Sequence, residues 1–511
     1  MPMMLTTRGL GRLVEPLTGC ALEGPEVHKR SLARAAALAR FDLARGDRVF
    51  LHHGNTIDFF VDLLAVWHLG ACAIPVDSRL VATEIATVAA AARPKLSIWD
   101  ASPAKTTLDA LHDAAVRVID AQQSAPPLER DAPGASFRLD DEALILFTSG
   151  TTGDPKGVVH THRTLRARWL GLYGALGVEA FRRTLCLLPT HFGHGLICNC
   201  LFPWFFGQDL YILPPFRADL IVKLGEIIDT HDITCLSSVP TVWRLALKIA
   251  RPPQRETLDR VLCGSAPLTG SLWRSVQGWT GTQNVINAYG ITETGSWLAG
   301  LTSLDIEPED GLIGEAWGGT LAVLPTHETS PQPDFLAACK PNEAGFVWIN
   351  TPALMKGYLD RDDLTSRVVV NGWFSTGDRG LLDDHGRLHL RGRVREEINK
   401  SGQKIYPTDI DTVIEQFEHA LDVCTFAVPD ALHGEDIGVA VVLETPSDEA
   451  MARLQEWTRG RLGLHQMPAR WYVVKTIPRT SRGKVNRQQV AEFCATLAPV
   501  PLAMPRGESP Q

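Results

Sequence analysis

Short apolar runs alternate with helical patterns along roughly the first 120 residues, and this alternation limits the possible folds more than any other feature of the chain. Helical patterns over 31–40 and 56–68 alternate with apolar runs over 49–51 and 71–75. Such an alternation predicts an α/β fold with parallel-type sheets covered by helices. It continues to about residue 390, after which the pattern changes to a compact α+β module that ends near residue 497.

The chain is too long for a single core. It has 511 residues, whereas one hydrophobic core serves about 100–200 residues. We therefore expect a large multi-layer N-terminal domain over 1–392, a small mobile α+β lid domain over 393–497 and a disordered tail over 498–511. Two lobes leave a cleft between them, as an enzyme requires.

Composition and charge exclude several classes of protein. The apolar fraction of 45% and the charged fraction of 21% are typical of a folded globular protein. The net charge of −8, without a long basic stripe, argues against a nucleic-acid partner. The ten cysteines are sparse, and the close pair Cys198 and Cys200 lacks the spacing of a zinc site. We expect reduced thiols and a cytoplasmic location.

We expect no stable membrane insertion. Residues 1–24 lack the apolar core and cleavage site of a secretory signal. The uncharged run 184–208 is long enough to cross a bilayer, but Pro189, Pro203 and two histidines interrupt it. A buried strand, a loop and a helix are the better interpretation of this run.

A loop rich in glycine and threonine follows a predicted buried strand. The apolar run 144–147 leads into residues 148–157, which contain three glycines and four hydroxyl groups. The glycines let the backbone approach a ligand closely, and the hydroxyl and N–H groups suit phosphate oxygens. The Walker A spacing is absent, which argues against ordinary P-loop ATPases and kinases. Taken alone, the loop is also compatible with a flexible connection.

Six motifs, in one order along the chain, resemble those of the adenylate-forming superfamily: acyl-CoA synthetases, firefly luciferase and the adenylation domains of peptide synthetases. They lie at 149–157, 264–268, 287–293, 372–378, 392–398 and 478–485. A looser match of the first 140 residues extends the resemblance over nearly the whole chain. The resemblance implies an enzyme that uses ATP and Mg²⁺ to convert a carboxylic acid into an acyl-adenylate, with release of pyrophosphate.

The resemblance also assigns catalytic roles. Attack of a carboxylate on the α-phosphorus brings two anions together, so cations and hydrogen-bond donors must converge there. Glu293 is expected to hold Mg²⁺, and Thr292 to donate to the α-phosphate. Lys484, on a loop of the lid, is expected to bridge the acyl carboxylate and the α-phosphate. His191 is expected to contact the carboxylate or to steer the closed state, with a buried core histidine as an equal alternative.

ATP and AMP are expected to contact residues from all parts of the resemblance. Tyr289 offers a face for adenine, Asn287 an amide for the purine edge, and Asp378, in a tight turn, a carboxylate for the ribose hydroxyls. Arg393 is a second expected ribose contact. The full expected set is Thr148, Ser149, Gly150, Thr151, Thr152, Gly153, Lys156, Gly264, Ser265, Ala266, Asn287, Ala288, Tyr289, Gly290, Thr292, Asp378, Arg393 and Lys484.

The acid is less constrained than the nucleotide. By resemblance, the acyl pocket is expected at His191, Phe192, Gly193, His194 and Trp297. No acidic residue occurs within 184–208, and a buried ammonium without a partner costs on the order of several kcal/mol. We therefore expect an acid without an α-amino group: an aryl, carbocyclic or medium-chain acid.

The acceptor is expected to be a thiol, which makes the enzyme an AMP-forming acid–thiol ligase. By resemblance, Arg395 is the hinge of the lid and Gly402 approaches the thiol tunnel. Coenzyme A is the first expectation, and a separate phosphopantetheinyl carrier protein or an amine is the alternative for a stand-alone adenylation enzyme. A luciferase-type oxygenase would share the motifs. A protein of a different class would bind acyl-adenylates without catalysis.

The variant Lys484→Ala tests the expected lid lysine. We expect it to abolish adenylate formation, because the ammonium that is expected to bridge the two reacting anions is removed. ATP–pyrophosphate exchange measures the loss, and circular dichroism shows that the fold is retained. Near-normal exchange in the folded variant would remove Lys484 from the mechanism.

Overall fold

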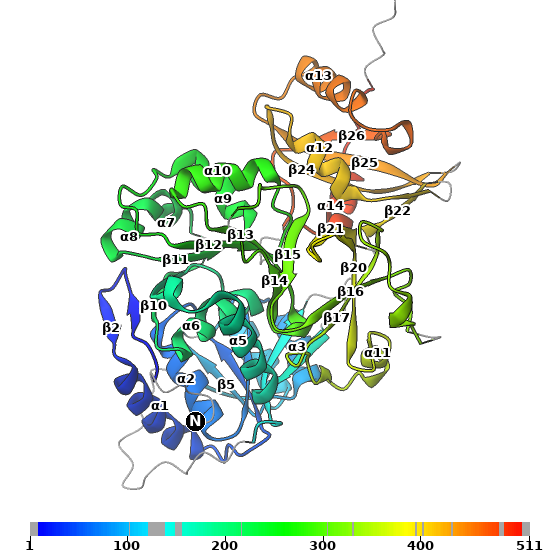
Figure 1. Cartoon of the computed structure of the whole chain (residues 1–511). Helices are drawn as coiled ribbons and strands as arrows, with labels where there is room; N and C mark the ends of the chain where they lie inside the picture. The colour runs from blue at the N-terminus through cyan, green and yellow to red at the C-terminus, as the bar shows by residue number, and fades with distance from the viewer. Residues whose placement is uncertain are drawn as a thin grey trace, which may run out of the picture.

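The chain folds into three β-sheets with helices packed against them. The computed structural model describes residues 9–101, 103–120, 138–148, 156–215, 217–303, 305–329, 332–393, 396–400, 403–430, 433–479 and 485–502. Figure 1 shows the C-terminal elements, in orange and red, at one end of the molecule and helix α1 (Gly24–Ala39) at the other.

A seven-stranded sheet forms the N-terminal layer, with the order β18-β8-β7-β4-β3-β5-β6. Its strands are parallel from β7 to β6, and β8 and β18 are antiparallel to their neighbours. The bounds are β3 (Arg48–His52), β4 (Cys72–Pro75), β5 (Leu96–Trp99), β6 (Arg117–Asp120), β7 (Glu142–Thr148), β8 (Lys156–Thr161), β18 (Gly357–Tyr358), α2 (Ile57–His68), α3 (Ala82–Ala92) and α4 (Lys105–Asp113). The alternation predicted from the sequence is confirmed. Helix α2, for example, begins where the Thr56 side chain accepts a hydrogen bond from the N–H of Phe59.

A fourteen-stranded sheet forms the centre, with the order β16-β17-β20-β21-β15-β14-β13-β12-β11-β9-β10-β1-β2 and β19 beside β20. The strands are β1 (Leu13–Glu15), β2 (Cys20–Leu22), β9 (Arg183–Cys186), β10 (Asp209–Ile212), β11 (Cys235–Ser238), β12 (Arg260–Gly264), β13 (Val285–Ile291), β14 (Ser296–Gly300), β15 (Leu312–Ala316), β16 (Thr320–Leu324), β17 (Gly345–Asn350), β19 (Val369–Val370), β20 (Trp373–Leu382) and β21 (Leu388–Arg393). The helices that accompany them are α5 (His162–Leu176), α6 (Phe202–Phe205), α7 (Ala218–Val222), α8 (Leu224–His231), α9 (Pro240–Ile249), α10 (Gly270–Thr280) and α11 (Asp362–Ser366).

The central sheet is parallel in one half and antiparallel in the other. The strands β1, β10, β9, β11, β12 and β13 are parallel to one another, as expected for an α/β fold. From β13 to β16 every pair along the order is antiparallel, which the sequence did not predict. A parallel pair needs a long crossover connection. The turn Thr292–Gly295 between β13 and β14 is far too short for one.

The uncharged run 184–208 is buried as predicted. It forms most of β9, a π-helix over His194–Leu201 and helix α6. Both cysteines of the close pair lie in the π-helix, and all ten cysteines of the chain lie in the described residues as free thiols. Among the helices that the structure describes, none combines the length and the hydropathy that a bilayer crossing needs.

A shared core joins the first two sheets. One hydrophobic cluster contains residues of β3 and β4, of β10, β12 and β13, and of helices α2, α5 and α6. Its largest side chains are those of Trp67, Trp169, Trp204, Trp297 and Trp317, each at most 1% exposed. Burying an aromatic side chain of this size contributes roughly 1.5–3 kcal/mol or more to folding. The two sheets are therefore held as one body.

The C-terminal module contains the third sheet, with the order β23-β22-β25-β24 and β26 beside β25. Its elements are β22 (Ile398–Lys400), β23 (Gln403–Ile405), α12 (Pro407–Glu415), β24 (Ala420–Asp430), β25 (Gly434–Leu443), α13 (Asp448–Arg459), β26 (Arg470–Val473) and α14 (Arg487–Cys494). The predicted α+β pattern is therefore present. The N–H of Val500 donates to the carbonyl of Trp471 at 2.7 Å, so the first residues of the expected disordered tail pack on this sheet. Residues 503–511 lie outside the described residues, and the division at 392/393 stays a prediction.

Three buried histidines make the stability of the fold dependent on pH. Burial lowers the pKa of His52 to about 3 and those of His160 and His162 to about 4. Below pH 6.5 the unfolded chain takes up a proton on each of these side chains, whereas the folded chain does not until about pH 4. The histidines therefore stabilise the fold above pH 6.5, and this contribution is lost as the pH falls. Burial also raises the pKa of Glu415, which acts in the opposite direction.

We expect the free energy of unfolding to fall between pH 6.5 and pH 4.5 by up to about 1.4 kcal/mol per pH unit for each buried histidine. His52→Phe should reduce this slope, because it removes one of the three histidines whose pKa is strongly lowered by folding. Urea unfolding at a series of pH values measures the slope, and His385→Phe, at an exposed position, is the control. A slope that His52→Phe leaves unchanged would contradict the assignment.

Candidate active site

A cleft of about 520 Å³ lies between the central sheet and the C-terminal module. Its first wall includes Arg244 of α9 and residues that the sequence assigned to the nucleotide: Ser265, Ala266, Asn287, Ala288, Tyr289, Gly290, Asp378 and Arg393. Its second wall consists of Thr408, Asp409, Asp411, Thr412 and Glu415 of α12 together with Asp422, Arg479, Val485 and Arg487. Five of the six predicted motifs are thus brought to one place.

The parallel strands explain why two of these motifs meet. Strands β12 and β13 are parallel neighbours, so their carboxyl ends lie at the same edge of the sheet. Gly264 ends β12, and a Cβ atom there would lie 2.4 Å from the carbonyl oxygen of Ala288. Glycine is therefore required for the close approach of the two strand ends. The next residue, Ser265, has a left-handed backbone (φ 67°), which is uncommon outside functional sites and turns.

Asp378 forms the polar centre of the first wall. The sequence placed it in a tight turn, but it lies within strand β20, directly across from Arg393 in β21. The Arg393 Nε donates to Asp378 Oδ1 at 2.9 Å, and the Tyr289 hydroxyl donates to Oδ2. Burial, followed by the charge of Asp378, raises the pKa of Tyr289 well above its usual value. The three predicted nucleotide residues therefore form one hydrogen-bonded group.

Asn287 is fixed in the same wall. It is 4% exposed, and its Nδ2 donates to the carbonyl of Leu312 at 2.8 Å. This bond orients the amide at the cleft, where the sequence expected it to face the purine. The contact with a purine itself stays a prediction.

Thr292 and Glu293 lie in a 3₁₀ turn that follows β13. The hydroxyl of Tyr358 donates to Glu293 Oε1 at 2.7 Å, and the Nζ of Lys156 lies 5.7 Å from the centre of the Tyr358 ring. The structure thus brings Lys156, at the end of the phosphate loop, beside the expected Mg²⁺ ligand. Tyr358 was missed from the sequence, because the two-residue strand β18 that carries it gives no recognisable pattern.

The residues expected in the acyl pocket cluster around His194. Its Nδ1 lies 2.8 Å from Ser265 Oγ and its Nε2 lies 2.6 Å from Ser237 Oγ. The ring centres of Trp297 and Phe192 lie 5.4 Å and 6.0 Å from that of His194. Gly193 is buried in the same segment. His194 therefore links the expected acyl pocket to the strand end that lines the cleft.

His191 contacts an acidic residue that the sequence reasoning missed. Its Nε2 lies 3.5 Å from Asp77 Oδ2. Burial acts to raise the pKa of Asp77, but hydrogen bonds from Arg79 and the nearby His191 outweigh it, so this pKa lies below its usual value. Both carboxylate oxygens accept from Arg79 at 2.9 Å. Asp77 comes from the loop after β4, more than a hundred residues before His191, so no local pattern signals the contact.

Several expected residues lie outside the described residues: Ser149, Gly150, Thr151, Thr152 and Gly153 of the phosphate loop, Arg395, Gly402 and Lys484. Thr148 ends β7 and Lys156 begins β8, so both ends of the phosphate loop are placed. Arg479 and Val485, which flank the loop of Lys484, both line the cleft and form an isolated β-bridge. The loop that carries Lys484 therefore starts and ends at the cleft.

One ion pair joins the two walls of the cleft. The Nη2 of Arg244, in α9, donates to Glu415 Oε1, in α12, at 2.8 Å. Burial raises the pKa of Glu415, although Arg244 acts in the opposite direction. The pair is only partly exposed, so it fixes the C-terminal module against the central sheet in this arrangement.

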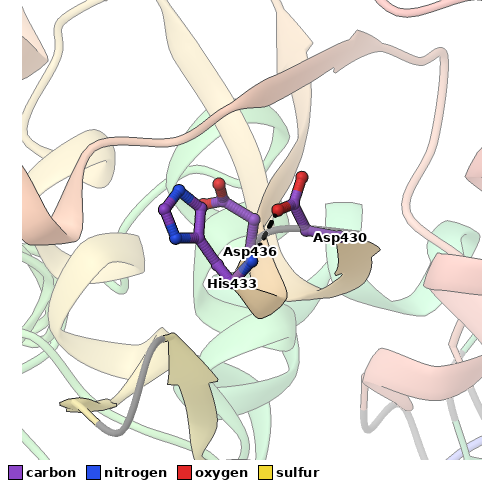
Figure 2. A group of neighbouring side chains, drawn as sticks. All are labelled: Asp430, His433 and Asp436. Atoms are coloured by element: carbon purple, nitrogen blue, oxygen red, sulfur yellow. Dashed lines mark hydrogen bonds between the residues drawn. The ribbon is translucent and has the colours of Figure 1, made fainter.

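A second polar cluster lies away from the cleft, in the hairpin that joins β24 and β25. Figure 2 shows Asp430, His433 and Asp436, whose potential metal-ligating atoms lie within 4.8 Å of one another. The Nζ of Lys400 lies 2.5 Å from Asp436 Oδ1. The positive charge that these carboxylates require is thus supplied, at least in part, by a lysine.

Comparison with known proteins agrees with the arrangement. Residues 19–359 match the family described as AMP-binding enzyme, and residues 409–484 match the AMP-binding enzyme C-terminal domain. The chain therefore belongs to the family of AMP-binding enzymes, and the resemblance to adenylate-forming enzymes is confirmed.

Named relatives extend over almost the whole chain. The long-chain-fatty-acid–CoA ligase FadD13 of Mycobacterium tuberculosis is 27% identical over 95% of this chain and 96% of its own length. The 4-chlorobenzoate–CoA ligase of Arthrobacter is 26% identical over 95% and 92%. The ATP-bound structure of MatB from Rhodopseudomonas palustris is similar with a TM-score of 0.84 at 25% identity, over 96% and 97%. The predicted α/β fold with a large and a small domain is confirmed.

Tyr289→Phe tests the polar centre of the first wall. We expect the free energy of unfolding to fall by about 1–3 kcal/mol, because a buried oxygen of Asp378 loses its donor. Urea unfolding measures the change. Tyr173→Phe, at a side chain of α5 that is 49% exposed, is the matched control and should change stability by less than about 0.5 kcal/mol. Equal effects of the two substitutions would contradict the role of the Tyr289 hydroxyl.

Proposed function

We propose that the protein is an AMP-forming acyl-CoA ligase. The observation that carries the proposal is the meeting of Tyr289, Asp378 and Arg393 in one hydrogen-bonded group at a cleft that also adjoins the loop of Lys484. The CoA-ligase relatives, which match over nearly the whole chain, support the same activity.

The first half-reaction is proposed to take place between the two walls. The ring of Tyr289 and the amide of Asn287 receive the adenine, and Asp378 with Arg393 receives the ribose. The acid carboxylate attacks the α-phosphorus of ATP, which forms an acyl-adenylate and expels pyrophosphate. Thr292 donates to the α-phosphate, and Lys484 neutralises the charge that develops between the two anions.

Glu293 fits the requirement for Mg²⁺. Its Oε1 accepts from the neutral hydroxyl of Tyr358, and carboxylate oxygens are ligands that a hard cation prefers. When bound, Mg²⁺ neutralises phosphate charge. The phosphates are proposed to be bound, on the side opposite Glu293, by Thr148, residues 149–153 and Lys156.

The second half-reaction is proposed to use the C-terminal module. Residues 393–497 would rotate about Arg395 as the lid, and Gly402 would approach the thiol that displaces AMP. The ion pair between Arg244 and Glu415 has to break in such a rotation, because its partners lie on the two walls.

The acyl pocket favours an acid without an α-amino group. Phe192, His194 and Trp297 provide aromatic surface, and His191 is proposed to contact the carboxylate or to steer the closed state. Asp77 is engaged by Arg79 on both oxygens, which leaves it poorly suited to hold an ammonium. We propose an aryl, carbocyclic or medium-chain acid.

Coenzyme A is the proposed acceptor and the cytoplasm the proposed location. A phosphopantetheinyl carrier protein or an amine is the alternative acceptor, and a non-catalytic acyl-adenylate-binding protein is the alternative of a different class. These alternatives share the cleft and differ only in the fate of the adenylate.

A panel of acids with ATP and Mg²⁺ tests the proposal. We expect pyrophosphate release and hydroxamate formation with aryl, carbocyclic or medium-chain acids, and stimulation by coenzyme A through thioester formation. α-Amino acids are the control class and should give little product. If a phosphopantetheinylated carrier or an amine consumes the adenylate and coenzyme A does not, that carrier or amine is the acceptor instead of coenzyme A. Tight ATP binding without pyrophosphate release for any acid would favour the binding protein.

A further inference from the structure

The backbone carbonyls of the turn that carries Glu293 form hydrogen bonds with residues from other segments of the chain. The carbonyl of Thr292 lies 2.8 Å from the Nε2 of His160, and that of Glu293 accepts from the N–H of Met355 at 2.7 Å. The carbonyl of Thr294 accepts from the Nε of Arg168 at 3.0 Å. The next carbonyl, that of Gly295, lies 3.2 Å from Cys198 Sγ.

His160 can make its contact in one tautomer only. A carbonyl oxygen accepts but never donates, so Nε2 must carry the hydrogen that it donates to Thr292. Nδ1 is then the acceptor and lies 3.2 Å from the hydroxyl of Thr164. His160 is completely buried near the end of β8, the strand that follows the phosphate loop. The ring therefore connects the phosphate-loop strand to the turn of Glu293.

Arg168 is an unusual residue to bury for a structural purpose alone. It is 0% exposed, and burial lowers its pKa to about 10 because the guanidinium is removed from water. Its Nη1 donates to the carbonyl of Trp317 at 2.6 Å, whereas its Nη2 has no hydrogen-bond partner among the described residues. An apolar side chain would fill such a space at lower cost.

The packing of Arg168 also fixes the end of the turn. Gly295 has a left-handed backbone (φ 71°), and a Cβ atom there would lie 3.4 Å from Cβ and Cγ of Arg168. The stem of the arginine thus lies against the backbone of Gly295 while its Nε holds Thr294. The backbone on both sides of Glu293 is immobilised by two side chains from β8 and α5.

We infer that His160 and Arg168 are positioning residues that hold Glu293 at the place where the metal–nucleotide complex binds. Neither residue was singled out by the motifs, and both come from the segment directly after the phosphate loop. The inference rests on the proposed function, because it takes Glu293 as the metal ligand. Its physical basis is that residues which orient a metal ligand typically change metal affinity or activity by roughly 10–100-fold when they are replaced.

The inference is tested by substitutions that remove the hydrogen-bond donors of His160 and Arg168 but keep most of the side-chain volume. His160→Gln keeps an N–H donor, whereas His160→Leu keeps much of the volume without one. Arg168→Met keeps an aliphatic side chain of similar length without the guanidinium. Arg168→Lys keeps a positive charge without the planar guanidinium and its several N–H donors. Arg166→Met, on the exposed side of α5, is the matched control.

Two readouts distinguish positioning from a loss of folded protein. The first is the half-saturating Mg²⁺ concentration in ATP–pyrophosphate exchange, which does not depend on the fraction of active enzyme. The second is the binding of Mn²⁺·ATP, followed by the loss of the electron paramagnetic resonance signal of free Mn²⁺, which needs no turnover. Both are measured at a temperature where circular dichroism shows each variant to be folded.

We expect His160→Leu and Arg168→Met to raise the half-saturating Mg²⁺ concentration and to weaken Mn²⁺·ATP binding by roughly 10-fold or more. His160→Gln should remain within about threefold of the parent, and Arg166→Met should leave both values unchanged. If Arg168→Met does not fold, the two His160 variants and Arg168→Lys decide the question. Unchanged metal values in folded His160→Leu, or equal losses in His160→Gln and His160→Leu, would overturn the inference. Absence of exchange in the parent with every acid would refute the proposed function, while the Mn²⁺·ATP readout would still test the two residues.

Discussion

The position of one short turn depends on hydrogen bonds from side chains that lie far away in the sequence. Thr292, Glu293 and Thr294 follow a buried strand and lead into an antiparallel one, so the chain reverses direction within a few residues. A carboxylate on such a turn would move with the backbone if the carbonyls bonded only to water. The carbonyls are instead hydrogen-bonded by His160 and Arg168, and the hydroxyl of Tyr358 donates to the carboxylate of Glu293. A charged group is thereby fixed before any ligand binds, which is how electrostatic preorganisation reduces the cost of reorganisation.

The remaining features of the cleft follow from the same need to place charges. Asp378 would be a buried carboxylate without compensation if Arg393 and Tyr289 did not donate to it. Its strand pairing with Arg393 sets that contact by backbone register rather than by a flexible loop. On the opposite wall, Arg487 donates to Asp411 and Glu396, and Glu415 accepts from Arg244 of the first wall. These carboxylates are therefore compensated within a wall or across the cleft, and displacement of the second wall exposes the Arg244–Glu415 pair to water.

Features that depend on local chemistry could be predicted from the sequence. The apolar run before the phosphate loop forms β7, the pattern over 56–68 forms α2 with Thr56 as its cap, and the uncharged run 184–208 is buried. The ordered motifs also located Ser265, Asn287, Tyr289, Asp378 and Arg393, which share one cleft. These successes rest on residues whose role is recognisable from their immediate neighbours.

Features that depend on tertiary packing could not be predicted. Asp77, Tyr358 and Arg168 act on residues more than sixty positions away, and an isolated Asp, Tyr or Arg gives no signal of its partner. The antiparallel half of the central sheet follows from connection lengths that the apolar pattern alone does not define. Asp378 looked like a turn residue because Ser, Thr and Gly precede it, but the ladder with β17 and β21 overrides that local preference.

Transfer of ¹⁸O from the acid to AMP tests the central claim most directly. The acid is labelled in both carboxylate oxygens and incubated with ATP, Mg²⁺ and coenzyme A. We expect AMP with one ¹⁸O atom, because the oxygen that attacks the α-phosphorus stays on AMP when the thiol takes the acyl group. Unlabelled AMP, or ADP with the label in orthophosphate, would contradict an acyl-adenylate formed in this cleft.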